Sequence, residues 1–567
     1  MIKEDLIKSL NQALEKLGVN NIDFNLDCPT NSNFGDYSTS IALKLVKILK
    51  KTPLEIAGSI IKNLEKNINI KKIEILKPGF INFWLSDEFL ISNTLNLLKN
   101  EKFNYTKFFL GENKKIMVEF AHPNTHKLFH IGHLRNISTG ESIVRIFEAV
   151  GNKVIRSNYQ GDVGLHIAKC LYIAMGMESK VKKLKTLKEK VEFIGRAYSE
   201  GTKAYEDDEK IKKEIIKINQ MIYDKDPKIM PLWNETRQWS LDYFDENYKR
   251  FYSHFDKFYF ESELPKRSTE IVKESLKKGI LEKSQGAVIF NGKKYGLDTR
   301  VFVNSHGFPT YEGKELALAE KEFSDFGELD KIIHTVTPEQ TSFFKVTFKV
   351  EELIDEKKYK NKQYHLIYEW VKLKQGKMSS REGNIIEANW LIDEVKKKII
   401  EKFKCDENTS EVLAIATVKY SFLKNSTQTI IAFDIDESIS IEGNSAPYIN
   451  YTYVRTQSVL NKANTDFNAI NWKFDNSRNF EEEESHIIRV LCQFPEIVTQ
   501  AAKQYSPNLI VNYIYDLTSI YNLFYQKHHI LNVDEKTKQF RLMLTKVVGK
   551  VIKEALYLLG IKVVEKM

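Results

Sequence analysis

The sequence predicts an α/β protein with a doubly wound parallel sheet in its middle, a small α/β domain before the sheet and an all-α bundle after it. Three observations carry this prediction: a strand, helix and strand in succession at residues 115–159, a charged helical stretch at about 178–262, and an almost wholly helical chain from residue 396 onward. The first is a βαβ unit, whose strands lie parallel because a crossover helix joins them. We expect three domains, at residues 1–105, 106–395 and 396–567, with the stretch 178–262 as an insertion into the second.

The first domain alternates helical and strand-like segments. Apolar periodicity predicts helices at Lys3–Lys16 and Ser38–Lys51, followed by short strands at Ile73–Leu76 and Phe80–Leu85. Residues 31–37, NSNFGDY, combine turn formers with two aromatic rings that could stack on a nucleic-acid base. The local pattern alone favours another interpretation, a turn whose rings cover a hydrophobic core.

The βαβ unit begins with a strand at Lys115–Ala121 and continues through HIGH, residues 130–133, into a helix at Leu134–Val150. Gly151 ends this helix, and a second strand follows at Lys153–Tyr159. In such a Rossmann-type unit the connection lies at the carboxyl edge of the sheet, where nucleotides bind and a helix N-terminus offers free N–H groups to phosphate. We therefore expect the chemistry to begin at HIGH.

The insertion separates two halves of the nucleotide-binding fold. Aromatic residues recur at helical spacing near its end, a pattern that usually marks a hydrophobic core rather than a ligand site. A turn at Gly161–Gly164 precedes the insertion and is expected to line the same cleft as HIGH. After the insertion, we expect strands at 286–290, 301–304, 331–337 and 365–373, helices at 313–323 and 389–403, and a polar loop at 374–384.

The last domain is predicted to be a helical bundle, with helices at Tyr448–Leu460, Glu484–Lys503, Leu509–Gln526 and Arg541–Leu559. Aromatic and basic residues alternate along these helices, so one side of the bundle could face an RNA strand. A plain bundle with solvated lysines explains the local pattern equally well.

Composition limits the classes of protein that the chain can belong to. The 85 basic and 76 acidic residues leave a net charge of +9, which permits a nucleic-acid partner without requiring one. The four cysteines form no CxxC pair, so neither a zinc knuckle nor a disulfide framework is suggested. No apolar run approaches the roughly 18 residues of a membrane span, and the N-terminus has no signal-peptide pattern. We expect a cytoplasmic monomer with no membrane partner.

Two basic loops would face each other across the carboxyl edge of the sheet. In the first, Gly132 lets the backbone approach a phosphate, while His130 and His133 can donate ring N–H groups. In the second, KMSSR at residues 377–381 supplies charge and hydroxyl donors from a loop that can close over a nucleotide. Neither a nucleophilic triad nor a carboxylate pair accompanies them, so we expect catalysis by positioning and by stabilising charge on phosphorus.

Four histidines at spacings of four, four and three raise a competing interpretation as metal ligands: His122, His126, His130 and His133. On one continuous helix they would share a face. The pair Pro123-Asn124 and the later Gly132 argue against such a helix. We therefore expect no metal site, and a metal-dependent nucleotidyltransferase or hydrolase is the third of our functional hypotheses.

HIGH at residues 130–133 and KMSSR at 377–381, separated by a split nucleotide fold, resemble the two signatures of class I aminoacyl-tRNA synthetases. The sequence segments around these two signatures narrow the resemblance to one family. VEFAHPNTHKLFHIGHLRN, VIRSNYQGDVG, PTYEGKELALA, APYINYTYVR and the terminal LYLLGIKVVEKM resemble arginyl-tRNA synthetases over almost the whole chain. NFGDYSTSIALKL and KPGFINFWL are similar to the additional N-terminal domain of that family.

The resemblance implies an arginine–tRNA ligase, which converts ATP and L-arginine to arginyl-adenylate and transfers the arginyl group to the 3′ end of tRNA(Arg). Mg²⁺ would accompany the nucleotide, and family members generally need bound tRNA even for the first step. The implied catalytic residues are His130, His133, Lys127 and Lys377. The implied ATP-binding residues are His130, Gly132, His133, Lys377, Met378, Ser379 and Ser380.

For arginine, the resemblance implies that Glu119 and Asn124 hold the α-amino group and neighbouring atoms. Tyr311, Glu315 and Gln340 would line the guanidinium pocket. A carboxylate suits that pocket because it can accept a bidentate pair from a planar guanidinium, which lysine cannot imitate. Without the resemblance, ordinary packing beside a strand would explain Tyr311 and Gln340.

For tRNA, the resemblance implies that Asn31 and Phe34 contact the D-loop and that Tyr451, Arg455 and the terminal Met567 contact the anticodon. Packing inside the helical bundle is a rival explanation for Tyr451. Because both regions of the tRNA would be gripped through phosphates, binding should weaken steeply with salt.

Several positions depart from the family pattern. Glu315 stands where the family usually has Asp, Ser380 replaces the second lysine of the signature, and His306 stands where Asp is frequent. Lys127, three residues before His130, is the charge that the family offers in compensation on the ATP phosphates. These departures motivate the second hypothesis, a tRNA-binding paralogue without aminoacylation activity.

Overall fold

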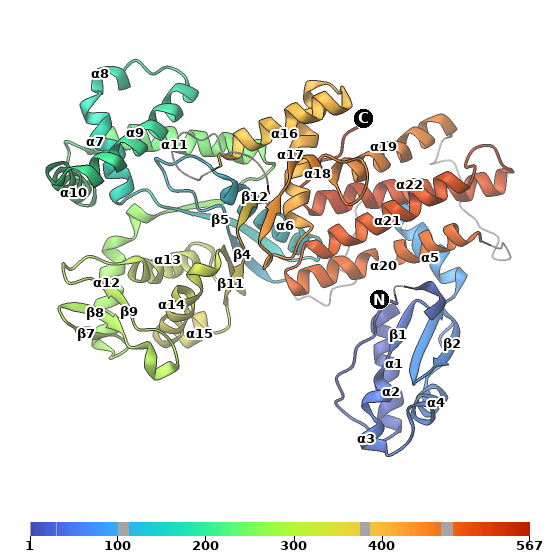
Figure 1. The fold of residues 1–567 in the computed structure, drawn as a ribbon. Coiled ribbons are helices and arrows are strands. Elements are labelled where there is room, and N and C mark those ends of the chain that lie inside the picture. The colour runs from blue at the N-terminus through green and yellow to red at the C-terminus, as the bar shows by residue number, and fades with distance from the viewer. Residues whose placement is uncertain (1, 30, 100–112, 375–385, 466–479) are drawn as a thin grey trace. The chain divides into compact units, whose positions relative to one another are not determined.

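The computed structural model describes residues 2–29, 31–99, 113–374, 386–465 and 480–567 (Figure 1). The chain packs as two compact units. The first comprises residues 1–109, 449–500 and 512–555, and the second comprises residues 110–448, 501–511 and 556–567. Within the described ranges, no helix is long and apolar enough to cross a membrane.

A five-stranded sheet in the order β11-β10-β4-β5-β6 forms the middle of the second unit. All neighbouring strands are parallel: β4 is Lys115–Glu119, β5 Lys153–Gln160, β6 Lys257–Phe260, β10 Lys331–Val336 and β11 Gln363–Ile367. Helix α6 (Ile131–Ala149) crosses from β4 to β5. The chain therefore winds outward from β4 in both directions, which confirms the predicted doubly wound fold.

Two predicted strands belong to another sheet. The segments predicted at 286–290 and 301–304 are β8 (Ala287–Phe290) and β9 (Arg300–Val303), which form an antiparallel sheet with β7 (Glu282–Ser284). Both strands are confirmed, but sequence periodicity carries no information about which sheet a strand joins, so their separate sheet was not predicted.

The strand predicted at 365–373 is divided between two sheets. Its first part is β11 of the parallel sheet, whereas β12 (Val371–Leu373) pairs with β13 (Ile431–Phe433). At the division, the Arg135 guanidinium donates to the carbonyl oxygens of Trp370, Thr427 and Thr429. A buried side chain on α6 thus holds together the two segments that meet at the division.

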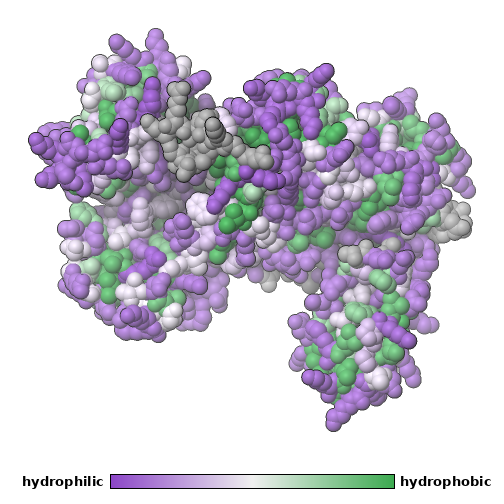
Figure 2. All heavy atoms as spheres, viewed as in Figure 1, coloured by the Kyte–Doolittle hydropathy of each residue, from purple (hydrophilic) through white to green (hydrophobic). Residues whose placement is uncertain are grey.

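The region predicted as the insertion, at about 178–262, contains four helices: α8 (Glu178–Val181), α9 (Leu187–Asp207), α10 (Glu209–Tyr223) and α11 (Met230–Arg250). A further helix, α7 (Leu165–Gly176), precedes it. The helical part of the region ends at Arg250 rather than near residue 262, because residues 257–260 are β6 and pair with β5. Tyr243, Phe244 and Tyr248 of α11 are buried, so the aromatic stripe is core as predicted. Figure 2 shows mainly hydrophilic residues over the outer side of α8–α10.

The remaining helices of the second unit come after β6 in the sequence, some of them between the later strands: α12 (Pro265–Lys277), α13 (Tyr311–Phe326), α14 (Thr341–Ile354), α15 (Glu356–Tyr359), α16 (Ala388–Phe403), α17 (Glu407–Leu423) and α18 (Ile435–Ser438). Apolar side chains of β4, α13, β10 and α14 share one core, which includes Met117, Leu318, Ile332 and Val346. This core fixes α13 and α14 against the strands that carry the candidate site.

The first unit contains a three-stranded antiparallel sheet and a helical bundle. The sheet order is β1-β3-β2, with β1 at Tyr37–Thr39, β2 at Ile70–Leu76 and β3 at Phe80–Leu85. The helix predicted at 38–51 is wrong at its start, because residues 37–39 pair with β3 and only α2 (Ile41–Lys44) and α3 (Val46–Leu49) are helical. Its other helices beside the sheet are α1 (Ile2–Lys16), α4 (Pro53–Asn63) and α5 (Asp87–Lys99).

The predicted C-terminal helices are confirmed as α19 (Ala446–Ala463), α20 (Glu482–Gln504), α21 (Asn508–Lys527) and α22 (Glu535–Leu558). Most of their residues lie in the first unit. The end of α22 and the residues after it belong to the second unit, as do residues 501–511.

Candidate active site

The connection between β4 and α6 is held in an unusual backbone conformation. Ala121, His122 and His126 all have positive φ, at 78°, 50° and 62°, although none is glycine. Such strain persists only where neighbouring groups fix the chain, and it is concentrated at functional sites. Here the Asn136 side chain of α6 accepts from Ala121 N at 2.6 Å and donates to Thr335 O at 2.7 Å.

His126 is a structural residue. Its Nε2 lies 2.8 Å from Thr236 Oγ1 and its Nδ1 lies 3.1 Å from Thr125 Oγ1, and burial lowers the pKa of the ring to about 3. The backbone N–H of His126 also donates to Ser240 Oγ on α11. Neither ring nitrogen is available as a ligand, and the described residues contain no group of three or more His, Cys, Asp or Glu side chains able to hold a metal ion.

The HIGH turn forms the N-terminus of α6. His130 is the N-cap residue: its Nδ1 accepts from Gly132 N, while His133 Nδ1 accepts from His130 N, each at 3.1 Å. The two rings stack with centroids 3.7 Å apart. A Cβ at Gly132 would lie 2.9 Å from His130 Cε1, so only glycine fits beneath this ring.

Hydrogen bonding determines the tautomer of both rings. Because each Nδ1 accepts from a backbone N–H, each proton of the neutral ring resides on Nε2. Burial lowers the pKa of His130 to about 4 and that of His133 well below its usual value, and the charge of Lys127 adds to both effects. Two neutral N–H donors therefore stand at the positive end of a helix, which suits a phosphate group.

Lys127 lies in the same connection, with its Nζ 5.2 Å from the ring centre of Tyr198 on α9. The second predicted loop cannot be placed beside it. Lys377, Met378, Ser379 and Ser380 fall outside the described residues.

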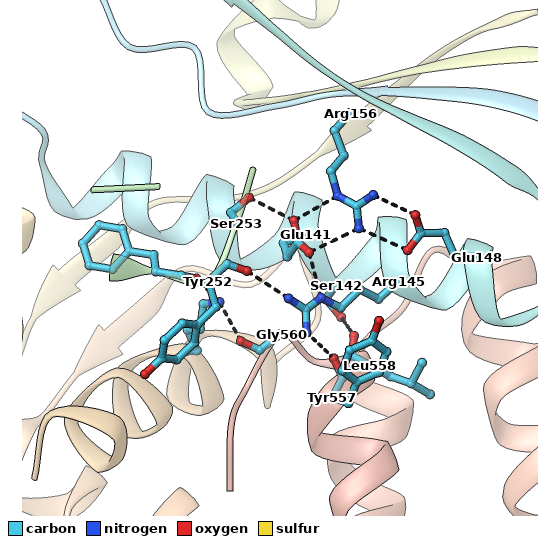
Figure 3. A network of polar contacts seen from close by, with 12 residues as sticks. Glu141, Ser142, Arg145, Glu148, Arg156, Tyr252, Ser253, Tyr557, Leu558 and Gly560 are labelled. Atoms are coloured by element: carbon cyan, nitrogen blue, oxygen red, sulfur yellow. Dashed lines mark hydrogen bonds and ion pairs between the residues drawn. The ribbon is translucent and has the colours of Figure 1, made fainter. Parts of the chain in front are cut away.

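The far half of α6 is fixed by a buried ionic network (Figure 3). Glu141 is fully buried and accepts hydrogen bonds from Arg145 Nε at 2.7 Å, Ser253 Oγ at 2.9 Å and two nitrogens of Arg156 at 3.4 Å. Although burial opposes ionisation, these charges and hydrogen bonds lower the pKa of Glu141. We call Glu141, Arg145, Arg156 and Ser253 the Glu141 cluster.

The Glu141 cluster continues to the end of the chain. Arg145 Nη1 donates to Tyr557 O at 3.0 Å, and Ser142 Oγ donates to Leu558 O at 3.0 Å (Figure 3). Lys419 of α17, also fully buried, donates to Gly560 O at 2.7 Å and to Phe251 O at 2.6 Å. The helix that begins with HIGH is therefore anchored at its other end by the C-terminal segment.

The turn after β5 lies against the turn after β4, as predicted. A Cβ at Gly161 would lie 2.2 Å from Asn124 Oδ1, so the absence of a side chain at Gly161 makes room for Asn124. Thr125 N also donates to Gly161 O at 2.9 Å. Next to them, Lys314 of α13 forms a buried ion pair with Glu261 and donates to Tyr223 OH.

Glu119 and Glu315 belong to a second buried cluster, together with Glu322, Glu351 and His334. Each of these five side chains is at least nine-tenths buried. His334 Nδ1 lies 3.0 Å from Glu119 Oε1, and its Nε2 lies 2.9 Å from Gln363 Oε1. We call the four glutamates and His334 the Glu119 cluster.

The Glu119 cluster has more acceptors than donors. Glu119 Oε2, Glu315 Oε1, Glu351 Oε1 and both carboxylate oxygens of Glu322 accept no hydrogen bond from a backbone N–H or a basic, amide or hydroxyl group, and the Glu119 and Glu322 carboxyl groups hydrogen-bond each other when Glu322 is protonated. Burial raises the pKa of Glu315 to about 7 and, with the charge of Glu315, that of Glu351 to about 8; it raises the pKa of Glu322 well above its usual value. A buried group that lacks partners is costly, so this excess of acceptors suits a cationic ligand.

Tyr311 and Gln340 lie at the ends of neighbouring elements. Tyr311 is the first residue of α13 and its side chain is 68% exposed. Gln340 ends the 3-10 helix η5 (Pro338–Gln340) after β10 and is also exposed. Packing beside a strand, the rival explanation for both residues, does not account for exposed side chains.

The first unit carries four of the residues implied for tRNA. Asn31 and Phe34 are exposed, and Phe34 is 48% accessible, whereas Tyr37 is buried. Only one of the two rings in this turn therefore covers a core. Tyr451 is 41% exposed on α19, and the Arg455 guanidinium lies between the rings of Tyr451 and Tyr525, at 4.8 and 4.6 Å. Met567 belongs to the second unit and is partly exposed.

Several residues of the candidate site were not predicted from the sequence: Glu261, Lys314, Glu322, His334, Glu351 and Gln363. The position of His334 could have indicated it, because this ionisable residue directly follows the apolar pair Ile332-Ile333 within the strand predicted at 331–337. The glutamates carried no such signal, because a carboxylate on the buried face of an amphipathic helix cannot be told from an exposed one until the helix is packed.

Three family models match the chain in succession. The family described as "Arginyl tRNA synthetase N terminal domain" matches residues 4–85, "tRNA synthetases class I (R), catalytic domain" matches residues 94–434, and "DALR anticodon binding domain" matches residues 449–567.

Curated relatives match nearly the full length. The arginine–tRNA ligase of Fusobacterium nucleatum is 31% identical over 548 residues, which cover 95% of this chain and 94% of the relative. That of Borrelia garinii is 32% identical over 582 residues, which cover 98% and 97%.

Solved structures share the fold. The arginyl-tRNA synthetase of Thermus thermophilus superposes with a TM-score of 0.84 at 23% identity and covers 100% of both chains. That of Plasmodium falciparum gives a TM-score of 0.83 at 22% identity and covers 100% of this chain and 99% of its own.

Proposed function

The chain belongs to the arginine–tRNA ligase family of class I synthetases, and we propose that the HIGH turn and the Glu119 cluster together form its adenylation site. The enzyme activates L-arginine with ATP to arginyl-adenylate and then transfers the arginyl group to the 3′ end of its tRNA. Family membership favours this activity over a tRNA-binding paralogue without it. The observation that carries the site proposal is the set of unpartnered, buried carboxylate oxygens on Glu119 and Glu315.

In the first step, the arginine carboxylate attacks the α-phosphorus of ATP and pyrophosphate leaves. We propose that His130 and His133 donate their Nε2 protons to phosphate oxygens as negative charge builds, while Gly132 allows the close approach of the backbone. Lys127 and Lys377 would neutralise the pyrophosphate, with Met378, Ser379 and Ser380 completing the second loop. Mg²⁺ would enter with the ATP phosphates as part of the substrate complex.

Arginine would be held by opposite charges at both ends. Glu119 Oε2 and Asn124 would receive the α-ammonium group, and Glu315 would pair with the guanidinium. Tyr311 and Gln340 would close the pocket from its exposed side. Glu315 has one methylene more than the Asp that is usual in the family. Its side chain is nevertheless buried, and its carboxylate is near enough to Glu119 for the charge of Glu119 to raise its pKa.

For tRNA, we propose contacts by Asn31 and Phe34 with the D-loop and by Tyr451, Arg455 and Met567 with the anticodon. The exposed rings of Phe34 and Tyr451 support these roles. We further propose a monomer that works in the cytoplasm, divided into domains at 1–105, 106–395 and 396–567. The family matches support three domains and favour a second boundary nearer residue 434.

Arginine-dependent ATP–pyrophosphate exchange, with and without tRNA, tests the activity, and removing Mg²⁺ tests the metal requirement. We expect His130→Ala and His133→Ala each to slow the exchange reaction by raising its activation free energy by about 2 to 4 kcal/mol. This is the scale of losing one preorganised hydrogen-bond donor. Unchanged exchange in both variants would exclude the proposed role of HIGH. Normal tRNA affinity with neither exchange nor charging would instead support the paralogue.

A further inference from the structure

His334 lies at the centre of the Glu119 cluster, on β10. Its ring nitrogens face two oxygens: Nδ1 faces Glu119 Oε1 at 3.0 Å and Nε2 faces Gln363 Oε1 at 2.9 Å. Gln363 is oriented by a third contact, because its Nε2 donates to Glu351 Oε2 at 2.8 Å. Glu351 thus fixes which end of the Gln363 amide points at the histidine.

Both partners of His334 are therefore acceptors. A neutral imidazole has one donor and one acceptor nitrogen, so it could satisfy only one of these two contacts. The ring satisfies both when each nitrogen carries a proton, which makes it an imidazolium. The orientation of the neighbouring groups thus indicates an imidazolium independently of the pKa.

The surroundings of His334 favour the same charge. Glu119 faces it from β4, Glu315 from α13 and Glu351 from α14, while Glu322 of α13 lies against the glutamates rather than against the ring. Two further histidines are near, His122 before α6 and His365 on β11, and burial lowers the pKa of both. Phe344 and Phe348 of α14 pack on the ring, with centroids at 5.0 and 5.5 Å.

We propose that His334 is a positioning residue for arginine: its imidazolium holds Glu119 ionised through Oε1, leaves Glu119 Oε2 for the α-ammonium group, and favours the ionised form of Glu315. The inference deepens the proposed function, since it rests on the assignment of Glu119 and Glu315 to arginine. Without a fixed cation, the four neighbouring carboxylates would compete for protons rather than present charge to the substrate.

The titration of the two residues agrees with this role. Although burial opposes it, the hydrogen bond to Glu119 and the charges of Glu119 and Glu315 raise the pKa of His334 to about 9. The pKa of Glu119 is lowered by the hydrogen bond and charge of His334 in spite of burial. Glu315 is poised between burial, which raises its pKa, and the charge of His334, which lowers it.

His334→Gln keeps a hydrogen-bond donor but removes the charge. We expect the dissociation constant of arginine near neutral pH to rise roughly 10- to 100-fold, the scale of one hydrogen bond to a charged group. The defect should shrink by at least about threefold near pH 8.5, where the carboxylates ionise without help. The Michaelis constant for ATP should stay within about twofold, since the phosphate donors lie on α6.

His365→Gln is the matched control. His365 also packs on Phe344, at 4.8 Å, but its Nε2 contacts the backbone oxygen of Val336 instead of a carboxylate. We expect its arginine affinity to stay within about twofold of the parent. Gln363→Leu provides a milder test, because it removes one acceptor of the imidazolium and should weaken arginine roughly three- to tenfold with the same pH dependence.

The experiment is calorimetric titration of arginine into the full chain and the three variants near pH 7 and near pH 8.5, beside the exchange assay. Loss of arginine affinity in His334→Gln that recovers at the higher pH, with His365→Gln normal, is the expected result. An unchanged affinity in His334→Gln, or a loss that is equal at both pH values, overturns the inference. Arginine binding without exchange in the parent chain would instead overturn the proposed function.

Discussion

The second unit buries two clusters of charged side chains, which differ in how completely their carboxylate oxygens are hydrogen-bonded. In the Glu141 cluster, both carboxylate oxygens of Glu141 accept hydrogen bonds, from Arg145, Arg156 and Ser253 (Figure 3). In the Glu119 cluster, His334 pairs with Glu119 alone, and five oxygens of the four glutamates accept no hydrogen bond from a basic, amide or hydroxyl group. The pKa of Glu141 is lowered, whereas those of Glu315, Glu322 and Glu351 are raised.

The contrast separates a structural use of buried charge from a functional one. A carboxylate leaves water at little net cost only when cations and hydrogen-bond donors replace the water around it. The Glu141 cluster meets this condition with protein groups and anchors α6 to the C-terminal segment. In the proposed site, the Glu119 cluster would meet this condition when arginine binds, and part of the binding energy would come from completing the site.

Glu141→Ala should give the largest effect on stability. Removing this carboxylate leaves Arg156 and Arg145 buried without their partner, and breaking a buried pair in this way costs about 3 to 5 kcal/mol. We expect a lower midpoint in thermal unfolding, with the Michaelis constant for arginine unchanged in the folded fraction. Glu148→Ala is the matched control, because Glu148 also binds Arg156 but its side chain is 36% exposed, and it should cost much less.

Glu315→Gln should have the opposite effect, damaging arginine kinetics while leaving stability intact. The change removes the proposed partner of the guanidinium, so we expect the kcat/KM for arginine to fall by about 2 to 4 kcal/mol and discrimination against lysine to weaken. Stability should stay the same or rise, since a neutral amide relieves repulsion among the four glutamates. Steady-state exchange kinetics and thermal unfolding of the same preparation measure both quantities. Unaltered arginine kinetics would show that Glu315 is not the guanidinium partner.

Arginine binding at the Glu119 cluster should depend on pH. In the proposed site, arginine would pair with ionised Glu315, whose pKa of about 7 lies above its usual value because of burial. Below that pKa a proton must leave before the guanidinium binds, so the Michaelis constant for arginine should fall as pH rises from about 6 to 8, by up to about tenfold per unit. In Glu315→Gln this dependence should vanish, although a smaller one from Glu351 can persist.

Lys419→Met should give the smallest effect. It removes two hydrogen bonds to backbone oxygens beside the Glu141 cluster, which contribute about 1 to 3 kcal/mol when their acceptors are left buried. Burial lowers the pKa of Lys419 to about 7, so the unfolded chain binds a proton between that pH and about 10 while the folded chain does not. Folding stability in the parent should therefore fall as pH is lowered over this range, and the slope should be weaker in the variant, as unfolding at several pH values would show.

The sequence predicted the parts of the site that depend on local order. HIGH lies on a strand–turn–helix unit, and the expected donors His130 and His133 form the first turn of α6 because Gly132 fits beneath a ring. The bundle helices and the aromatic core of α11 were also predictable, since their apolar periodicity is regular. These features need only a few neighbouring residues to be defined.

The sequence could not predict pairings between distant segments. His334 on β10 and Glu322 on α13, which hydrogen-bond Glu119, lie more than 190 residues away along the chain, and no local pattern links them. The same limit explains why the separate sheet of β8 and β9 was not predicted, and why the strand at 365–373 was not divided at the site where Arg135 binds Trp370. Sheet membership and charge pairing arise from packing.

Proton release on arginine binding tests most directly whether the Glu119 cluster is completed by its substrate. Calorimetric titrations of arginine near pH 6.5, in buffers of different ionisation enthalpy, measure the number of protons exchanged. The account predicts a net release of about half a proton to one proton per arginine, because the guanidinium displaces the proton of a Glu315 whose pKa lies near 7, and no release in Glu315→Gln. Arginine that binds the parent chain tightly without releasing protons would contradict it.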